Sequence, residues 1–143
     1  MRVALPVHEK FNITKMMKYK KILVIDDRRE VRLLISTCLR NLPYDVIEAT
    51  CGEEGLAILE IKQPDLILLD ILMPGGMDGL AVCRRIKKRT DWAMIPVVIM
   101  TTMGQMADRS DAFLAGADEY IVKPFSVEIF LKTIRQFLDG VDV

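Results

Sequence analysis

Short apolar runs that each end in a polar residue recur along this chain. Residues 22–25 are followed by Asp26, 66–69 by Asp70, 97–100 by Thr101, and 120–122 by Lys123. Short apolar runs bounded by polar residues are typical of buried strands. A carboxylate that ends a buried strand is costly unless it has a partner or a task, so these strand ends are candidate functional positions.

Segments with helical periodicity alternate with the predicted strands. The predicted strands cover 22–25, 44–49, 65–69, 96–100 and 118–122, and the predicted helices cover 29–41, 52–62, 78–89, 105–115 and 127–138. The apolar face of the first predicted helix consists of Val31, Leu34, Ile35, Cys38 and Leu39. Five strands alternating with five helices predict an α/β fold built on a doubly wound parallel sheet.

The polar strand ends are expected to meet at one edge of this sheet. Open α/β folds place their sites at the carboxyl ends of parallel strands. Asp26, Asp70, Thr101 and Lys123 would therefore lie close together, with Asp27 directly beside Asp26. Three carboxylates, a hydroxyl and an ammonium in one place are suited to binding a divalent cation and a phosphoryl group.

A hard cation such as Mg²⁺ (or Mn²⁺) prefers oxygen ligands and keeps some of its waters. We expect Asp27 and Asp70 to give one carboxylate oxygen each, and Asp26 to act directly or through water. The backbone carbonyl of Leu72 is within reach of the same site. Because clustered carboxylates repel one another, a bound cation would relieve that repulsion.

The remaining groups suggest phosphoryl chemistry. A carboxylate that attacks phosphorus forms an acyl phosphate, which is a known covalent intermediate, and Asp70 is the candidate nucleophile. Lys123 would neutralise charge on the phosphoryl oxygens, and Thr101 would donate a hydrogen bond to one of them.

Composition narrows the class of protein. The 143 residues suffice for one domain, and 20 basic residues balance 20 acidic ones, which argues against direct nucleic-acid binding. No apolar run approaches the roughly 20 residues that span a bilayer, and the N-terminus lacks the apolar core of a signal peptide, so a cytoplasmic protein without membrane contact is expected.

The three cysteines form no Cys-x-x-Cys motif and are expected to be reduced and mostly buried. The only histidine, His8, precedes the predicted domain, which excludes enzymes that need a histidine base there.

These residues occur in motifs that resemble the receiver domain of two-component response regulators. The resemblance runs from Lys20 to about Leu138 and rests on the segments 24–27, 69–74, 77–79, 100–101, 116–120 and 123–125, which read VIDD, LDILMP, MDG, MT, GADEY and KPF. It implies a flavodoxin-like sheet in the order 2-1-3-4-5, and a Lys-Pro peptide bond that is usually cis.

The resemblance also implies roles for individual residues. Asp70 would accept a phosphoryl group from the phosphohistidine of a sensor histidine kinase or phosphotransfer protein, with Asp26 and Asp27 serving Mg²⁺. Lys123 and Thr101 would contact the phosphoryl group, and Tyr120 would change rotamer as part of the switch. The domain would be a phosphoacceptor and not an ordinary enzyme, although it would assist its own phosphorylation and dephosphorylation.

The output surface implied by the resemblance is the face of the fourth helix, fifth strand and fifth helix. This face would bind a downstream target protein or a second copy of the chain. Its expected residues are Ala107, Asp108, Asp111, Asp118, Glu119 and Lys132.

We expect an N-terminal extension over 1–19, a receiver domain over 20–139 and a C-terminal tail over 140–143. The main alternative is a receiver-like adaptor that binds partners without phosphorylation. A haloacid-dehalogenase-type phosphatase would need an aspartate at position 72, where this chain has Leu72. A nucleotide-binding protein would need a glycine-rich loop after the first strand, where this chain has the charged residues 27–30.

Overall fold

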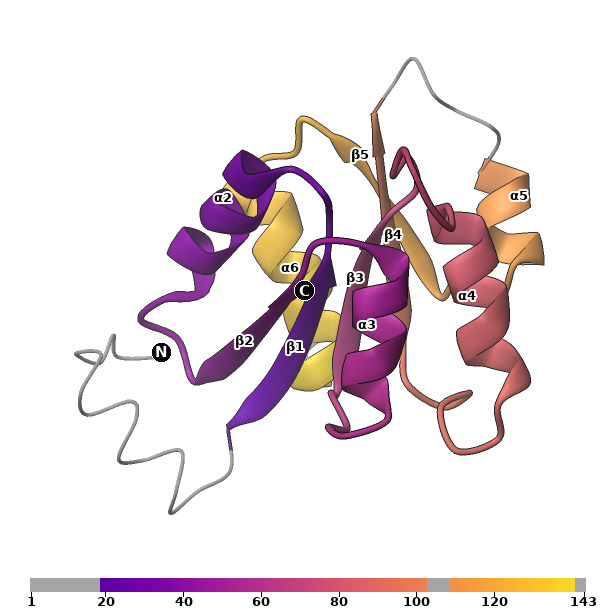
Figure 1. Ribbon diagram of the computed structural model, residues 1–143. Coiled ribbons are helices and arrows are strands. Elements are labelled where there is room, and N and C mark those ends of the chain that lie inside the picture. Colours follow the sequence, from indigo (N-terminus) through magenta and orange to yellow (C-terminus); the bar gives the residue numbers. More distant parts are fainter. Residues whose placement is uncertain (1–18, 103–108, 141–143) are drawn as a thin grey trace.

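Five parallel strands form the centre of the protein. The computed structural model describes residues 19–102 and 109–140, and the strands of its single sheet lie in the order β2-β1-β3-β4-β5 (Figure 1). The strands are β1 (Lys20–Ile25), β2 (Tyr44–Ala49), β3 (Leu66–Asp70), β4 (Val97–Thr102) and β5 (Glu119–Lys123). The helices are α2 (Arg29–Leu39), α3 (Gly52–Leu59), α4 (Gly79–Lys88), α5 (Arg109–Leu114) and α6 (Val127–Leu138).

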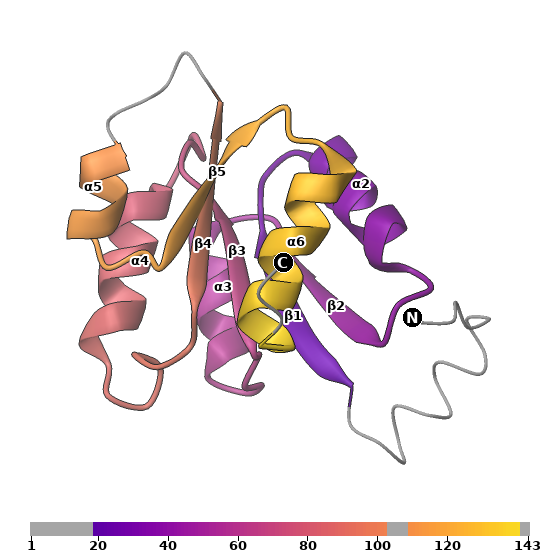
Figure 2. The ribbon, with the colours of Figure 1, turned by 180° about the vertical axis from the view of Figure 1, so that it is seen from behind.

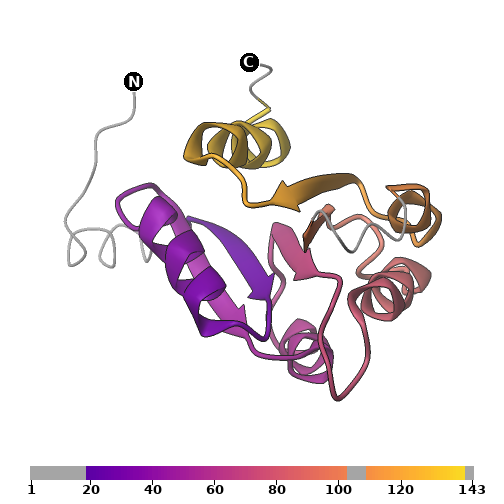
Figure 3. The same cartoon turned by 90° about the horizontal axis from the view of Figure 1, so that it is seen from above.

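The helices form two layers around the sheet. Helices α2 and α6 cover one face, and α3, α4 and α5 cover the other, as the view from above shows (Figure 3). Successive strand residues point to opposite faces. In β1, Ile22 and Val24 pack in the core on the α2–α6 side, whereas Leu23 and Ile25 pack in the core on the α3–α5 side. A strand buried on both faces needs an apolar residue at every position, which explains the continuous apolar runs.

The predicted fold class, strand order and alternation of elements are confirmed, with element ends shifted by one to three residues in most cases. The predicted helix over 105–115 is described only from Arg109, because residues 103–108 lie outside the described part of the chain. Residues 1–18 and 141–143 also lie outside it, so the predicted boundaries of the extension and the tail stay predictions. Within residues 19–102 and 109–140, no helix is long and apolar enough to cross a membrane.

The cysteines are free thiols, as predicted. Cys83 is buried, and this burial raises the pKa of its thiol to about 11. Burial also raises the pKa of Cys38, which is half-buried like Cys51. Of the thiols that were expected to be mostly buried, Cys83 is buried, whereas Cys38 and Cys51 are intermediate.

One residue of the predicted core is on the surface. Leu34 was expected on the buried face of α2, but it is 49% exposed. It borders a hollow of about 270 Å³ between α2 and the segment after β5, which is lined by Arg28, Val31, Leu34, Thr102, Lys123, Pro124 and Phe125. The helical period places Leu34 near the apolar stripe, but the core on this side of the sheet contains Ile35 and Leu39 of α2 and not Leu34.

A partly exposed ionic clip, formed by Lys87 and Asp118, joins α4 to the starts of β4 and β5, at the edge of the sheet opposite the polar strand ends. Figure 2 shows the segment after α4 leading into β4 at that edge. The Lys87 ammonium donates to the carbonyls of Ala93 and Ile95 at 3.1 and 2.7 Å and pairs with Asp118 at 2.8 Å. The same Asp118 oxygen accepts the Val97 N–H at 2.8 Å. The aspartate of the GADEY motif therefore ties the start of β5 to the start of β4.

Lys87→Met is expected to lower the free energy of unfolding by about 2 kcal/mol, because it leaves two carbonyls and part of the Asp118 carboxylate without their donor. Urea unfolding measures this loss. Lys88→Met is the matched control, since the exposed Lys88 side chain makes no hydrogen bond or ion pair among the described residues. Equal losses from the two substitutions would contradict a structural role for the clip.

Candidate functional site

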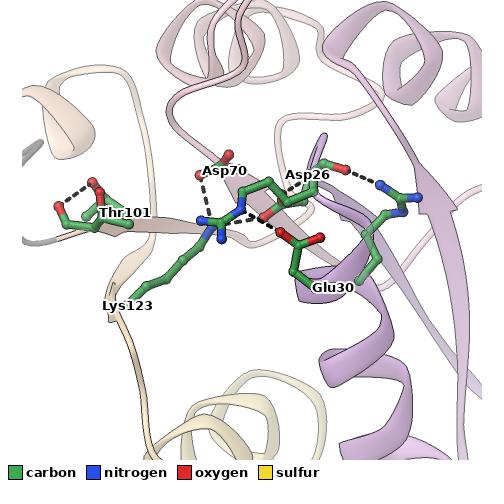
Figure 4. A network of polar contacts seen from close by, with 8 residues as sticks. Asp26, Glu30, Asp70, Thr101 and Lys123 are labelled. Atoms are coloured by element: carbon green, nitrogen blue, oxygen red, sulfur yellow. Dashed lines mark hydrogen bonds and ion pairs between the residues drawn. The ribbon is translucent and has the colours of Figure 1, made fainter.

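An ammonium group lies between two buried carboxylates at the carboxyl edge of the sheet. The Lys123 Nζ atom is 2.9 Å from an Asp26 oxygen and 3.1 Å from an Asp70 oxygen. Figure 4 shows Lys123 reaching from β5 to these two residues. Asp26 is 0% exposed, Asp70 5% and Lys123 8%. The structure therefore brings together three of the residues that the strand-end pattern singled out.

Hydrogen bonds with the neighbouring backbone hold Asp26 in place. Asp26 follows β1 directly, and its N–H donates to the Ala49 carbonyl at the end of β2, at 3.1 Å. Its second carboxylate oxygen accepts the Arg28 N–H at 2.9 Å. Both oxygens of the buried Asp26 carboxylate thus have a donor, which a buried charge requires.

The other two residues are held by the ends of their strands. Asp70 is the last residue of β3, and the next N–H, that of Ile71, donates to the Met100 carbonyl of β4. Lys123 is the last residue of β5 and precedes Pro124 through a cis peptide bond, as the resemblance implied. Parallel register therefore places both side chains at the same edge.

The electrostatics of the site disfavour a charged Asp70. Burial, followed by repulsion from Asp26, raises the pKa of Asp70 from 3.8 to about 6, and the attraction of Lys123 offsets only part of this effect. Asp26 and Asp27 both repel a negative charge on Asp70, and the single ammonium of Lys123 does not balance three carboxylates.

The acidic residues can hold a cation. Asp26, Asp27 and Asp70 each offer a carboxylate oxygen, and these three oxygens lie within 4.8 Å of one another. An all-oxygen donor set with net negative charge suits Mg²⁺ or Mn²⁺. Asp27 is exposed and, among the described residues, its side chain makes no hydrogen bond or ion pair. Of the three carboxylates, that of Asp27 is therefore the one most accessible to an incoming cation.

The remaining predicted residues lie near the cluster but do not all face it. Thr101 is buried in β4, and its hydroxyl donates to the Thr102 carbonyl at 3.3 Å and not to Asp70 (Figure 4). Tyr120 is half-buried in β5, with the Arg109 guanidinium 5.7 Å from its ring centre. The Leu72 side chain is 51% exposed, and a role for its carbonyl as a ligand stays a prediction.

The sequence reasoning missed one residue that contacts the site. The Arg32 guanidinium donates to the Asp26 carbonyl at 2.8 Å and pairs with Glu48 of β2 at 3.1 Å. Arg32 lies in the first turns of α2, from which a long side chain reaches back to the end of β1. The sequence shows only that Arg32 lies six residues after Asp26. That spacing alone does not predict the contact, because every residue has a backbone carbonyl that could accept the hydrogen bond.

Comparisons with known proteins agree with this architecture. The sequence pattern of the family described as response regulator receiver domain matches residues 22–135. A relative named DNA-binding dual master transcriptional regulator RpaA, from Synechocystis, is 41% identical over 122 residues, which are 85% of this chain and 50% of the relative. The chain spans about half the length of the curated relatives it matches.

Solved structures show the same fold. A putative response regulator from Chloroflexus aurantiacus has a TM-score of 0.80 and 30% identity, over 85% of this chain and 99% of that one. The receiver domain of the sensor histidine kinase PA1611 from Pseudomonas aeruginosa, solved with a magnesium ion coordinated in its active site cleft, has a TM-score of 0.76 and 25% identity, over 84% of this chain and 98% of that one.

The exclusion of nucleic acid is not supported. It rested on the net charge of zero, yet RpaA is named as a DNA-binding regulator. About half of that relative lies outside the matched region, so the charge balance of the matched half says nothing about what the whole protein binds.

Proposed function

Because the chain belongs to the family of response regulator receiver domains, we propose that Asp70 is its phosphoacceptor and that a histidine kinase or phosphotransfer protein supplies the phosphoryl group. The observation that carries the proposal is the cluster itself, in which Lys123 contacts Asp70 and Asp26 while Asp27 completes a trio of acidic oxygens. Domains of this family act as signalling modules.

The proposed reaction moves one phosphoryl group between two nucleophiles. An Asp70 carboxylate oxygen attacks phosphorus, so an O–P bond forms while the P–N bond of the phosphohistidine breaks and its electron pair returns to the imidazole nitrogen. Lys123 is placed to turn from the carboxylates to the phosphoryl oxygens. The Asp70 carboxyl must be ionised to attack, which its raised pKa disfavours when no cation is bound.

Asp26, Asp27 and Asp70 would hold Mg²⁺, and the Leu72 carbonyl would be a further ligand. The bound ion would supply the positive charge that the cluster lacks and offset the charge of the phosphoryl oxygens. The magnesium ion in the cleft of the Pseudomonas receiver domain supports this assignment.

The switch would begin at Thr101. Its hydroxyl now bonds within its own strand, so turning toward a phosphoryl group on Asp70 would exchange one weak hydrogen bond for a stronger one to an anion. Tyr120, half-buried three residues before Lys123, would follow by changing rotamer. Phosphorylation would thus shift the balance between two conformations.

The output surface would be the α5–β5–α6 face, for a target protein or a second copy of the chain. Asp111, Glu119 and Lys132 of the expected residues lie on its elements, whereas Ala107 and Asp108 lie outside the described residues. Asp118 is held by Lys87 and the Val97 N–H, so it is a structural residue and not a free charge for a partner.

Intact mass after incubation with Mg²⁺ and acetyl phosphate tests the proposal. The wild-type chain is expected to gain one phosphoryl group, and Asp70→Asn none. Asp111→Asn, which changes an exposed aspartate on α5, is the matched control and should be phosphorylated like the wild type. If neither acetyl phosphate nor a phosphorylated histidine kinase modifies the wild type, the phosphorylation-independent adaptor becomes the better account.

A further inference from the structure

Asp27 differs from the other two acidic residues in the way its side chain is held. Asp26 is held by Lys123 and the Arg28 N–H, and Asp70 by Lys123, but the exposed Asp27 carboxylate makes no contact of this kind among the described residues. The backbone alone therefore sets where the Asp27 Cβ lies and which side-chain rotamers can reach the other two carboxylates.

One arginine holds the carbonyl that directly precedes Asp27. The peptide unit between Asp26 and Asp27 is planar, so holding its carbonyl oxygen also orients the bond that leads into Asp27. Arg32 donates to this carbonyl at 2.8 Å. The Arg32 side chain is only 13% exposed, and its second contact, to Glu48 at 3.1 Å, anchors it to β2.

We propose that Arg32 is a positioning residue that orients Asp27 for cation binding through the peptide between Asp26 and Asp27. This inference rests on the proposed cation site and adds a residue from outside the ligand set. Groups that orient metal ligands commonly change metal affinity by about 10-fold or more when they are removed.

The charge of Arg32 makes the test decisive. Replacing Arg32 with methionine removes a positive charge beside a cation site, and by Coulomb's law this change alone would strengthen Mg²⁺ binding. Weaker binding by Arg32→Met must therefore come from lost positioning. Arg29→Met is the matched control, because it removes an exposed arginine of the same helix that makes no hydrogen bond or ion pair among the described residues.

Calorimetric titration with MgCl₂, without any phosphodonor, provides the direct measurement. We expect Arg32→Met to weaken Mg²⁺ binding by about 10-fold, and Arg29→Met to bind as tightly as wild type or slightly more so. Glu48→Gln keeps the bond to the Asp26 carbonyl and should weaken binding less than Arg32→Met does. Urea unfolding in EDTA establishes that each variant is folded, and Arg32→Gln replaces Arg32→Met if the latter is not.

A second readout separates positioning from general damage. The rate of phosphorylation by acetyl phosphate should need a higher Mg²⁺ concentration in Arg32→Met but reach the wild-type value at saturation. Unchanged Mg²⁺ affinity in a folded Arg32→Met chain would overturn the inference alone. Absence of Mg²⁺ binding by the wild type would instead overturn the proposed cation site on which the inference rests.

Discussion

Asp70→Asn is expected to raise the free energy of unfolding of the metal-free protein by about 2–3 kcal/mol at about pH 8. The Asp70 side chain is buried, and its pKa rises from 3.8 to about 6 because burial and Asp26 both disfavour its charge. Keeping that carboxylate ionised in the folded state therefore costs stability, and the neutral amide removes the cost. Its oxygen can still accept a hydrogen bond from Lys123.

The pH dependence of this effect has a definite sign. A folded-state pKa above the unfolded value means that the stabilising contribution of Asp70 is fully present below about pH 4 and is lost as the pH rises through about 6. The advantage of Asp70→Asn should therefore grow between these values and then level off. Urea unfolding of both chains in EDTA across this range measures the difference.

Two outcomes would contradict this account of Asp70. One is an advantage that does not change with pH, and the other is a loss of stability at about pH 8. Asp111→Asn serves as the control, because its exposed carboxylate should give nearly no difference at any pH. Added Mg²⁺ should shrink the difference, since a cation that needs Asp70 stabilises only the wild type.

Most of the sheet could be predicted from the sequence because four of its five strands carry an apolar run that ends in a recognisable polar residue, whereas β2 has no such run. Asp26, Asp70 and Lys123 converge as the parallel arrangement requires. The order of the strands came from the resemblance, since alternating strands and helices are compatible with more than one order.

The contacts that depend on tertiary packing could not be predicted. Lys87 lies among other basic residues in the last turn of α4, and the sequence does not single it out, because its partners come from the following loop and from Asp118, which lies 31 residues away. Leu34 followed the helical period of α2, but no neighbouring element covers it as completely as it covers Ile35. Arg32 acts on a backbone oxygen, which every residue possesses. The contacts of Lys87 and Arg32 and the exposure of Leu34 thus depend on groups that are distant in sequence or that belong to the backbone.

Gly79→Ala is expected to lower the free energy of unfolding by about 3 kcal/mol or more. A Cβ at position 79 would collide with the Asp70 carbonyl oxygen and lie only 2.7 Å from the Ile71 Cα. Both are backbone atoms at the end of β3, where no side-chain rotation can relieve the overlap. The Gly79 N–H also donates to the Ile71 carbonyl at 2.8 Å, so the start of α4 is fastened to the same place.

The sign of this change is informative, because alanine is favoured over glycine inside a helix by about 1 kcal/mol. A loss of stability must therefore come from the close approach of α4 to β3, which explains the glycine of the MDG motif. Gly76→Ala is the matched control, since its Cβ would meet only the movable Glu53 carboxylate, at 3.0 Å. Urea unfolding of both variants without metal tests the idea, and a Gly79→Ala chain as stable as wild type would refute it.

Because the collision involves the Asp70 carbonyl, Gly79→Ala should also displace the acceptor and slow its phosphorylation by acetyl phosphate, whereas Gly76→Ala should leave that rate near the wild-type value.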